Sequence, residues 1–167
     1  MWGYEVEPPA GFDYSLADET TERPLSSWMS LGVRLARDRS TASHETAALV
    51  LPTGARGPAF LLKSNFRVIL RYNTALAYGL SVAHLADRLR GDPPFLRDWP
   101  RSDRMLTRAE RKELQTLLAH RGFDPGPVDG KVGPKTRAAV RAYQASVGLL
   151  PDGYTETILL ERIRANP

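Results

Sequence analysis

Side chains capable of acid–base or nucleophilic chemistry are few in this chain and lie far apart. The three histidines, His44, His84 and His120, have no acidic or histidine partner at the spacing of metal ligands, so core or helix-end roles are expected of them. The chain has no cysteine, which excludes disulfides and cysteine-based zinc or nucleophile chemistry. No Ser/His/Asp triad, P-loop or dinucleotide-binding glycine motif can be assembled. We therefore predict no cofactor, no metal site and no catalytic residue.

The carboxyl-terminal third contains two Asp-Gly turns that flank a helix. The segment from Asp124 to Gly130 lacks the alternating acids and terminal Glu of a calcium loop, and we interpret it as a turn. Asp129-Gly130 and Asp152-Gly153 also predict turns, since Asp bonds the backbone two residues on and Gly accepts positive φ. Pro134 suits the first position of the helix between them, and Gly148 suits the position just past its end. Its buried face is predicted to be Thr136, Val140, Tyr143 and Val147.

Two further helices complete a predicted three-helix module. Thr107 and Glu110 have the spacing of a capping box, and the helix that they begin is expected to end at Gly122. Its inward residues are predicted to be Leu114, Leu117 and Leu118. Downstream, Thr155 can cap a last helix. That helix is predicted to bury Ile158, Leu159 and Ile163.

The order of these motifs resembles the bacterial peptidoglycan-binding domain. The matching residues are Leu-Gln-x-x-Leu from Leu114, Asp-Gly-x-x-Gly-x-x-Thr from Asp129, Ala-Val-x-x-Tyr-Gln from Ala139 and Gly-Leu-x-x-Asp-Gly from Gly148. The resemblance covers about Leu106 to Arg164 and implies binding of cell-wall glycan or its peptide stems, without chemistry of its own. The peptidoglycan contacts that it implies, each of which could equally be structural, are Phe123, Asp129, Gly130, Tyr143 and Asp152.

The preceding residues predict a mainly α-helical domain with one short β-hairpin. Residues 1–24 are expected to be irregular because Pro8-Pro9 and Pro24 interrupt regular structure. Residues 25–31 can form a short helix that buries Trp28, and the apolar runs 47–51 and 59–63 predict the hairpin as the only sheet. The longest helical pattern runs from Asn65 to Arg90. Its core residues are predicted to be Leu76, Leu80 and Ala83, thickened by Val82, Leu85, Ala86 and Leu89.

Several segments of this region resemble the end of the catalytic domain of MltB-type lytic murein transglycosylases. They are residues 65–73, residues 78–89, Trp2-Gly3-Tyr4-Glu5-Val6 and Gly57-Pro58-Ala59-Phe60-Leu61. The family cleaves the MurNAc–GlcNAc bond without water, using one Glu in a Glu-Ser-x-Phe-Gly type motif as acid and then base. That motif is missing from this sequence. The resemblance therefore implies the carboxyl-terminal part of such an enzyme, inactive alone, in which only Asp87 or Glu45 could serve as a replacement acid.

The resemblance also implies a fold, a domain division and a saccharide-binding segment. Residues 1–92 would form a partial lysozyme-like helical domain, 93–104 a linker and 105–167 the peptidoglycan-binding domain. Tyr72, Asn73 and Tyr78 match the substrate-lining residues of the family, and aromatic rings with hydroxyl and amide groups suit a sugar. The alternative is that both tyrosines are packing residues of a long helix. Because Tyr72 and Tyr78 would be about 120° out of alignment in an unbroken helix, we predict a break at Asn73 or Thr74, with Asn73 bonding freed backbone groups.

Charge and composition limit the partners and the compartment that we expect for this chain. The formal charge of +4 arises entirely after residue 100, where 12 Lys and Arg face 8 Asp and Glu. Such a surface suits an anionic wall polymer or is an ordinary solvated face. We predict peptidoglycan as partner, no nucleic acid, no membrane span and a monomer. No signal peptide is recognisable, yet the resemblance places the protein in the periplasm or at the cell wall. The alternatives are a self-sufficient murein-cleaving enzyme and a basic nucleic-acid-binding module.

Overall fold

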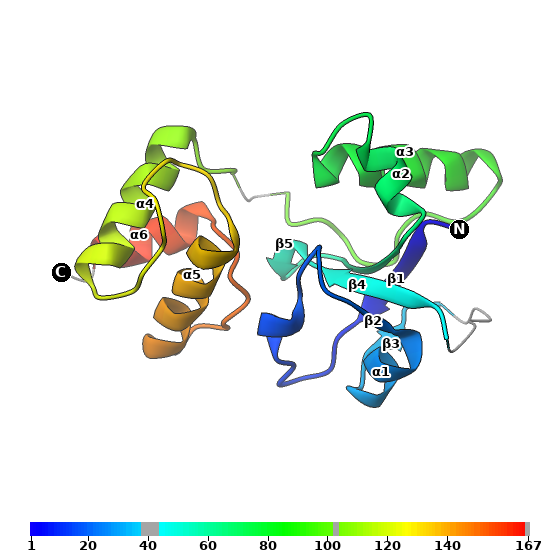
Figure 1. Cartoon of the computed structure of the whole chain (residues 1–167), viewed down its shortest axis with the longest axis horizontal. Coiled ribbons are helices and arrows are strands. Elements are labelled where there is room, and N and C mark those ends of the chain that lie inside the picture. Colours follow the sequence, from blue (N-terminus) through cyan, green and yellow to red (C-terminus); the bar gives the residue numbers. More distant parts are fainter. Residues whose placement is uncertain (38–43, 102–103, 166–167) are drawn as a thin grey trace. The chain divides into compact units, whose positions relative to one another are not determined.

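Figure 1 shows the computed structural model of the chain, which describes residues 1–37, 44–101 and 104–165. The backbone divides into two compact units, Met1–Trp99 and Pro100–Pro167. Each unit has its own hydrophobic core, and each is described by itself.

The N-terminal unit is built on a five-stranded antiparallel sheet with the strand order β2-β4-β6-β1-β3. Its strands are β1 (Gly3–Glu7), β2 (Glu22–Pro24), β3 (Arg34–Leu35), β4 (Thr46–Val50) and β6 (Ala59–Lys63). A further strand, β5 (Pro52–Ala55), lies outside this order. The two predicted hairpin strands do pair, with Leu49 opposite Leu61. The prediction of a mainly helical, partial lysozyme-like domain with one short hairpin is nevertheless wrong.

The sheet is covered on both faces, which explains why its central strand is continuously apolar. In β6, Ala59 and Leu61 belong to one core cluster, whereas Phe60 and Leu62 belong to the other. Helix α1 (Leu25–Ser30) covers the first face, and α2 (Phe66–Leu70) and α3 (Leu76–Leu89) cover the second (Figure 1). Trp28 of α1 is fully buried and donates its Nε1–H to the carbonyl of Ala47 at 2.9 Å.

The first 24 residues contain two strands and a short 3-10 helix, so the prediction of an irregular segment is wrong. β1 lies between β6 and β3, and a short 3-10 helix, η1 (Tyr14–Leu16), follows it. The side chains of Tyr4 and Val6 lie in the core cluster that contains Leu61, whereas Trp2 lies in the cluster that contains Phe60. A Cβ added at Gly3 would lie 2.4 Å from the carbonyl oxygen of Leu61, so only glycine allows β1 to approach β6 this closely.

The C-terminal unit contains α4 (Arg108–His120), α5 (Pro134–Ser146) and α6 (Thr157–Ala165). The capping box of Thr107 and Glu110 is confirmed, as is Pro134 in the first turn of α5. In α6 the prediction of Leu159 and Ile163 as buried residues is confirmed, but Ile158 is 55% exposed and the fully buried Leu160 was not predicted. Among the residues that the structure describes, no helix is both long and apolar enough to cross a membrane.

The capping box makes the C-terminal unit sensitive to acid. Glu110 accepts hydrogen bonds from both terminal nitrogens of Arg104, at 2.8 and 2.6 Å, and from the backbone of Thr107 at 2.7 Å. The Arg104 contact is the main reason that the pKa of Glu110 lies far below its ordinary value of 4.5. A carboxylate with a depressed folded-state pKa stabilises the fold above its unfolded pKa, and this stability is lost as the pH falls through the folded pKa.

We therefore expect Glu110→Gln to destabilise the C-terminal unit at pH 7 and to lose this effect in acid. The difference between the two proteins in the free energy of unfolding should shrink steadily below about pH 4.5. Urea denaturation followed by circular dichroism at several pH values measures it. Glu161→Gln, on the exposed side of α6, controls for the loss of one charge. A difference that stays constant from pH 7 to pH 2 would contradict this role of Glu110.

Candidate functional site

The helix predicted over residues 65–90 is broken where the sequence indicated. Helix α2 ends at Leu70 and α3 begins at Leu76, so the predicted step near Asn73 is confirmed. The side-chain oxygen of Asn73 accepts a hydrogen bond from the backbone N–H of Ala75 at 2.9 Å, which confirms the prediction that Asn73 bonds a freed backbone group. Tyr72 is 86% exposed and Tyr78 is 41% exposed. Both rings are therefore accessible to a large ligand.

The break allows α2 to fold back against α3. Gly79 of α3 is buried, and a Cβ added there would lie 2.6 Å from the Phe66 ring and 3.0 Å from Leu70. This close contact explains a glycine in a helix interior, where it costs about 1 kcal/mol relative to alanine. Because α2 packs against α3, the exposed segment from Tyr72 to Tyr78 is held in place at both ends.

The two carboxylates considered as catalytic acids are both engaged in other contacts. Glu45 pairs with Lys63 at 2.7 Å and accepts a hydrogen bond from the Tyr4 hydroxyl at 3.3 Å. The hydrogen bond from Lys63 is the main reason that the pKa of Glu45 is lowered. Asp87 accepts a hydrogen bond from the Trp2 indole at 2.5 Å and also pairs with Arg90. A general acid needs a raised pKa, so the environment of Glu45 is opposite to the one required.

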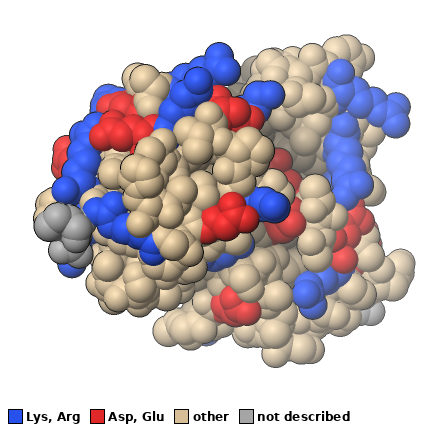
Figure 2. All heavy atoms as spheres, turned by 60° about the vertical axis from the view of Figure 1, so that its left-hand side comes forward, with Lys and Arg blue, Asp and Glu red and all other residues tan. Residues whose placement is uncertain are grey.

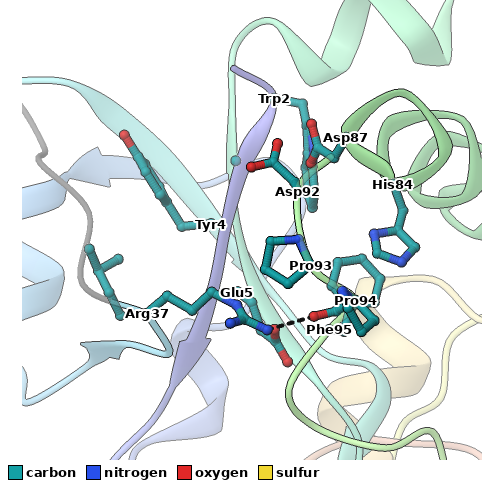
Figure 3. Close-up of a pocket in the computed structure, with 12 residues that line it drawn as sticks. Trp2, Tyr4, Glu5, Arg37, His84, Asp87, Asp92, Pro93, Pro94 and Phe95 are labelled. Carbon is teal, nitrogen blue, oxygen red and sulfur yellow. Dashed lines mark hydrogen bonds between the residues drawn. The ribbon is translucent and has the colours of Figure 1, made fainter. Parts of the chain in front are cut away.

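A small hollow lies between β1 and the segment that follows α3 (Figure 3). The carboxylate of Glu5 accepts backbone hydrogen bonds from Leu96 and Arg97 at 2.8 and 2.9 Å. The ring of Phe95 stacks on His84 with centroids 3.8 Å apart. A further hydrogen bond, dashed in Figure 3, runs from the Arg37 guanidinium to the carbonyl of Pro94 at 2.7 Å. These contacts attach the start of the predicted linker to the N-terminal unit.

In the C-terminal unit, two buried glutamines hold the two Asp-Gly turns in the same way. The side-chain oxygen of Gln115 accepts the N–H of Gly130 at 2.9 Å, and that of Gln144 accepts the N–H of Gly153 at 2.9 Å. Asp129 and Asp152 each accept an N–H two residues on, at 2.8 and 2.9 Å. Both glutamines belong to motifs recognised in the sequence, Leu-Gln-x-x-Leu and Ala-Val-x-x-Tyr-Gln, but this role in holding the turns was not predicted.

The five peptidoglycan contacts implied by resemblance are not equally accessible. Tyr143 is only 2% exposed, and Gly130 is buried at a positive φ of 77°. Phe123 is partly buried and meets Tyr143 edge-to-face with centroids 5.9 Å apart. Atoms that a polymer could reach therefore belong to Phe123 and to the turn residues Asp129 and Asp152.

Several basic side chains of the C-terminal unit form ion pairs with acidic ones. Arg104 pairs with Glu110, Arg164 with Glu113 at 2.7 Å, and Lys135 with Asp124 at 3.8 Å. On the face that Figure 2 shows, basic and acidic side chains are interspersed and separated by uncharged surface. The net positive charge is therefore not gathered into one basic patch on this face.

The comparisons with known proteins cover both units. Residues 1–87 match the family described as the transglycosylase SLT domain, and residues 107–163 match the putative peptidoglycan binding domain. An uncharacterized protein of Kitasatospora aureofaciens, described as lying in the bpoA1 3′ region, is 34% identical over 87 residues. That alignment spans 47% of this chain and 71% of the relative.

Two solved structures resemble nearly the whole chain. They are crystal structures of SltB3 from Pseudomonas aeruginosa, in complex with NAG-anhNAM-pentapeptide and with NAG-NAM-pentapeptide. Each matches with a TM-score of 0.91 and 49% identity over 98% of this chain and 44% of that chain. This chain thus spans less than half the length of SltB3. The matches confirm the resemblance to lytic transglycosylases and to peptidoglycan-binding domains.

Proposed function

We propose that this chain, which belongs to the family of transglycosylase SLT domains, binds peptidoglycan through its C-terminal unit. The observation that carries the proposal is the match of residues 107–163, which span all but the ends of the three-helix unit, to the peptidoglycan-binding family. The complexes of SltB3 with saccharide–pentapeptide fragments support the same class of ligand. We therefore propose that the chain acts at the cell wall or in the periplasm.

We further propose that the N-terminal unit supplies one wall of the glycan cleft of a lytic murein transglycosylase. Tyr72, Asn73 and Tyr78 would contact the sugar, because their segment is exposed and held by the packing of α2 on α3. Glu45 and Asp87 are engaged in other contacts, so the non-hydrolytic cleavage of MurNAc–GlcNAc bonds in cell-wall turnover is assigned to the full-length enzyme. The division into residues 1–92, 93–104 and 105–167 stays a prediction.

We expect the full chain to co-sediment with purified insoluble peptidoglycan. Phe123→Ala should weaken binding about three- to tenfold, because it removes an accessible aromatic contact. Tyr143→Phe should leave binding unchanged, because the hydroxyl of Tyr143 is buried within the unit. A loss of binding on Tyr143→Phe, with the fold intact, would contradict this placement of the contact surface.

Two controls separate specific binding from general adhesion. Insoluble cellulose offers β-1,4-linked sugars without peptide stems, and the chain should bind it less. A DNA mobility-shift titration with salt tests the nucleic-acid alternative, since charge-driven binding falls steeply as salt increases. The proposed function is wrong if the folded chain stays in the supernatant with peptidoglycan at low salt.

A further inference from the structure

The two Asp-Gly turns of the C-terminal unit differ in the residue that follows the glycine. Lys131 follows Gly130, whereas Tyr154 follows Gly153. The backbone N–H of Lys131 donates to the aspartate two residues before it at 2.8 Å, and that of Tyr154 does the same at 2.9 Å. Because the same turn forms with tyrosine at this position, the positive charge of Lys131 is not needed to form it.

Two basic residues of α4, Arg108 and Lys112, lie against the first of these turns. A Cβ added at Gly130 would lie 2.8 Å from the Cγ atom of Arg108 and 3.2 Å from that of Lys112. The Nε–H of Arg108 also donates to the carbonyl of Asp129 at 3.3 Å. The aliphatic parts of both side chains therefore cover the glycine, and their charged ends extend from the edge of the turn. We call Arg108, Lys112 and Lys131 the basic cluster.

The basic cluster keeps a net positive charge. Its three side chains are exposed, and none of them forms an ion pair with an acid in the part of the chain that the structure describes. Arg104 and Arg164 of the same unit, by contrast, pair with glutamates at 2.6 and 2.7 Å. Asp129 belongs to the turn itself, and its carboxylate accepts the N–H of Lys131. Three cations beside one carboxylate leave this surface suited to an anionic ligand.

We propose that the basic cluster binds carboxylates of the peptide stems of peptidoglycan. The N-acetylated sugars of the glycan strand carry no charge, whereas the peptide stems end in free carboxylates. Guanidinium and ammonium groups form charge-assisted hydrogen bonds with carboxylates. The saccharides bound to SltB3 carry a pentapeptide, which supports a ligand with stems. The inference rests on the proposed function and names the part of the polymer that the C-terminal unit recognises.

Methionine substitution separates the charge of the cluster from its packing. Methionine keeps an unbranched chain over Gly130 and has a helix propensity close to those of Arg and Lys, but it carries no charge. The neutral variant combines Arg108→Met, Lys112→Met and Lys131→Met. The control variant removes three exposed positive charges elsewhere through Arg34→Met, Arg88→Met and Arg162→Met.

Two forms of insoluble peptidoglycan are compared by co-sedimentation of the full chain. Both are freed of phosphate-containing wall polymers with hydrofluoric acid, and one is then amidated with a carbodiimide and ammonia to neutralise its carboxylates. On the unmodified form, we expect the neutral variant to bind about tenfold more weakly than the wild-type chain, the scale of three exposed charge pairs. The control variant should bind within about twofold of the wild-type chain, because its charges lie outside the cluster. On the amidated form, the wild-type chain and the neutral variant should bind alike.

A charge-preserving variant checks that the sign of the charge matters rather than the identity of the side chains. Arg108→Lys, Lys112→Arg and Lys131→Arg together should bind the unmodified form like the wild-type chain. Circular dichroism verifies that every variant is folded. If the neutral variant loses its fold, Lys131→Tyr, which takes the residue of the second turn, replaces it and should bind about twofold more weakly.

Three results would overturn the inference. The first is a folded neutral variant that binds the unmodified form like the wild-type chain. The second is a loss of the same size on the amidated form, which would assign the effect to uncharged contacts. The third is a loss seen only before hydrofluoric acid treatment, which would assign the cluster to wall phosphates. Failure of the wild-type chain to sediment with either form would instead contradict the proposed function, and that measurement involves no variant.

Discussion

We expect Trp28→Ala to lower the free energy of unfolding of the N-terminal unit by about 3–5 kcal/mol. Trp28 is fully buried between α1 and the sheet, and its removal also leaves the carbonyl of Ala47 without the indole donor. Domains of this size have a total stability of about 5–15 kcal/mol, so the variant should be close to unfolding. All three tryptophans lie in this unit, and the fluorescence of the remaining Trp2 and Trp99 in a urea titration reports on it selectively.

The matched control is Trp99→Ala, which removes the same side chain from a half-open position. Trp99 is 37% exposed and touches Phe60 and Phe95 with ring centroids 6.1 and 6.3 Å apart. We expect a loss of about 1 kcal/mol, the scale of an aromatic pair beyond its area. Equal losses in the two variants would contradict the assignment of Trp28 as the central residue of its core.

Features that depend on neighbouring residues were predictable from the sequence. The break before Leu76 followed from the misalignment of Tyr72 and Tyr78 in an unbroken helix, and the weak helix formers Asn73-Thr74 indicated its place. The capping box followed from the spacing of Thr107 and Glu110. The pairing of β4 and β6 followed from two apolar runs on either side of a Gly/Pro turn. In each case the partners that form the structure lie close in sequence, the most distant pair being Ala47 and Lys63.

The rest of the sheet could not be predicted in this way because its pairs are distant in sequence. β1 pairs with β6, so Tyr4 lies opposite Leu61. No local sequence pattern predicts that register. Tyr4 and Val6 do alternate with Glu5 and Glu7, a strand signal that the neighbouring prolines outweighed. β2 and β3 span only three and two residues, too few for any periodicity. The strand count was therefore underestimated.

The candidate site was also predicted only in part from the sequence. Tyr72, Asn73 and Tyr78 were singled out through the resemblance to lytic transglycosylases, and the helix break was predicted so that both tyrosines could face one cleft. No role was predicted for Gln115 and Gln144, because a glutamine beside a buried apolar residue gives no local signal of which backbone N–H its side chain will accept. The prediction that Val82, Leu85, Ala86 and Leu89 thicken the core was wrong, because all four are exposed. An apolar helix side gives the same sequence pattern whether or not it is buried within the chain.

The other large effect is expected in the C-terminal unit, where Leu160→Ala should lower the free energy of unfolding by about 2–5 kcal/mol. Leu160 is completely buried in the core formed by α4, α5 and α6. This unit contains no tryptophan, so its unfolding is followed by circular dichroism at 222 nm. The tryptophan fluorescence transition of the same sample should stay where it is, which shows that the loss is confined to one unit.

Ile158→Ala is the matched control, because it removes an aliphatic side chain of the same size from the same helix. Ile158 is exposed, and alanine has the higher helix propensity, so we expect a change within about 0.5 kcal/mol. The pair tests which side of α6 faces the core, the point on which the sequence pattern alone was wrong. If Ile158→Ala proved the more damaging of the two, α6 would have to be rotated about its axis, and the core around Leu114 and Tyr143 would be packed differently from the one described.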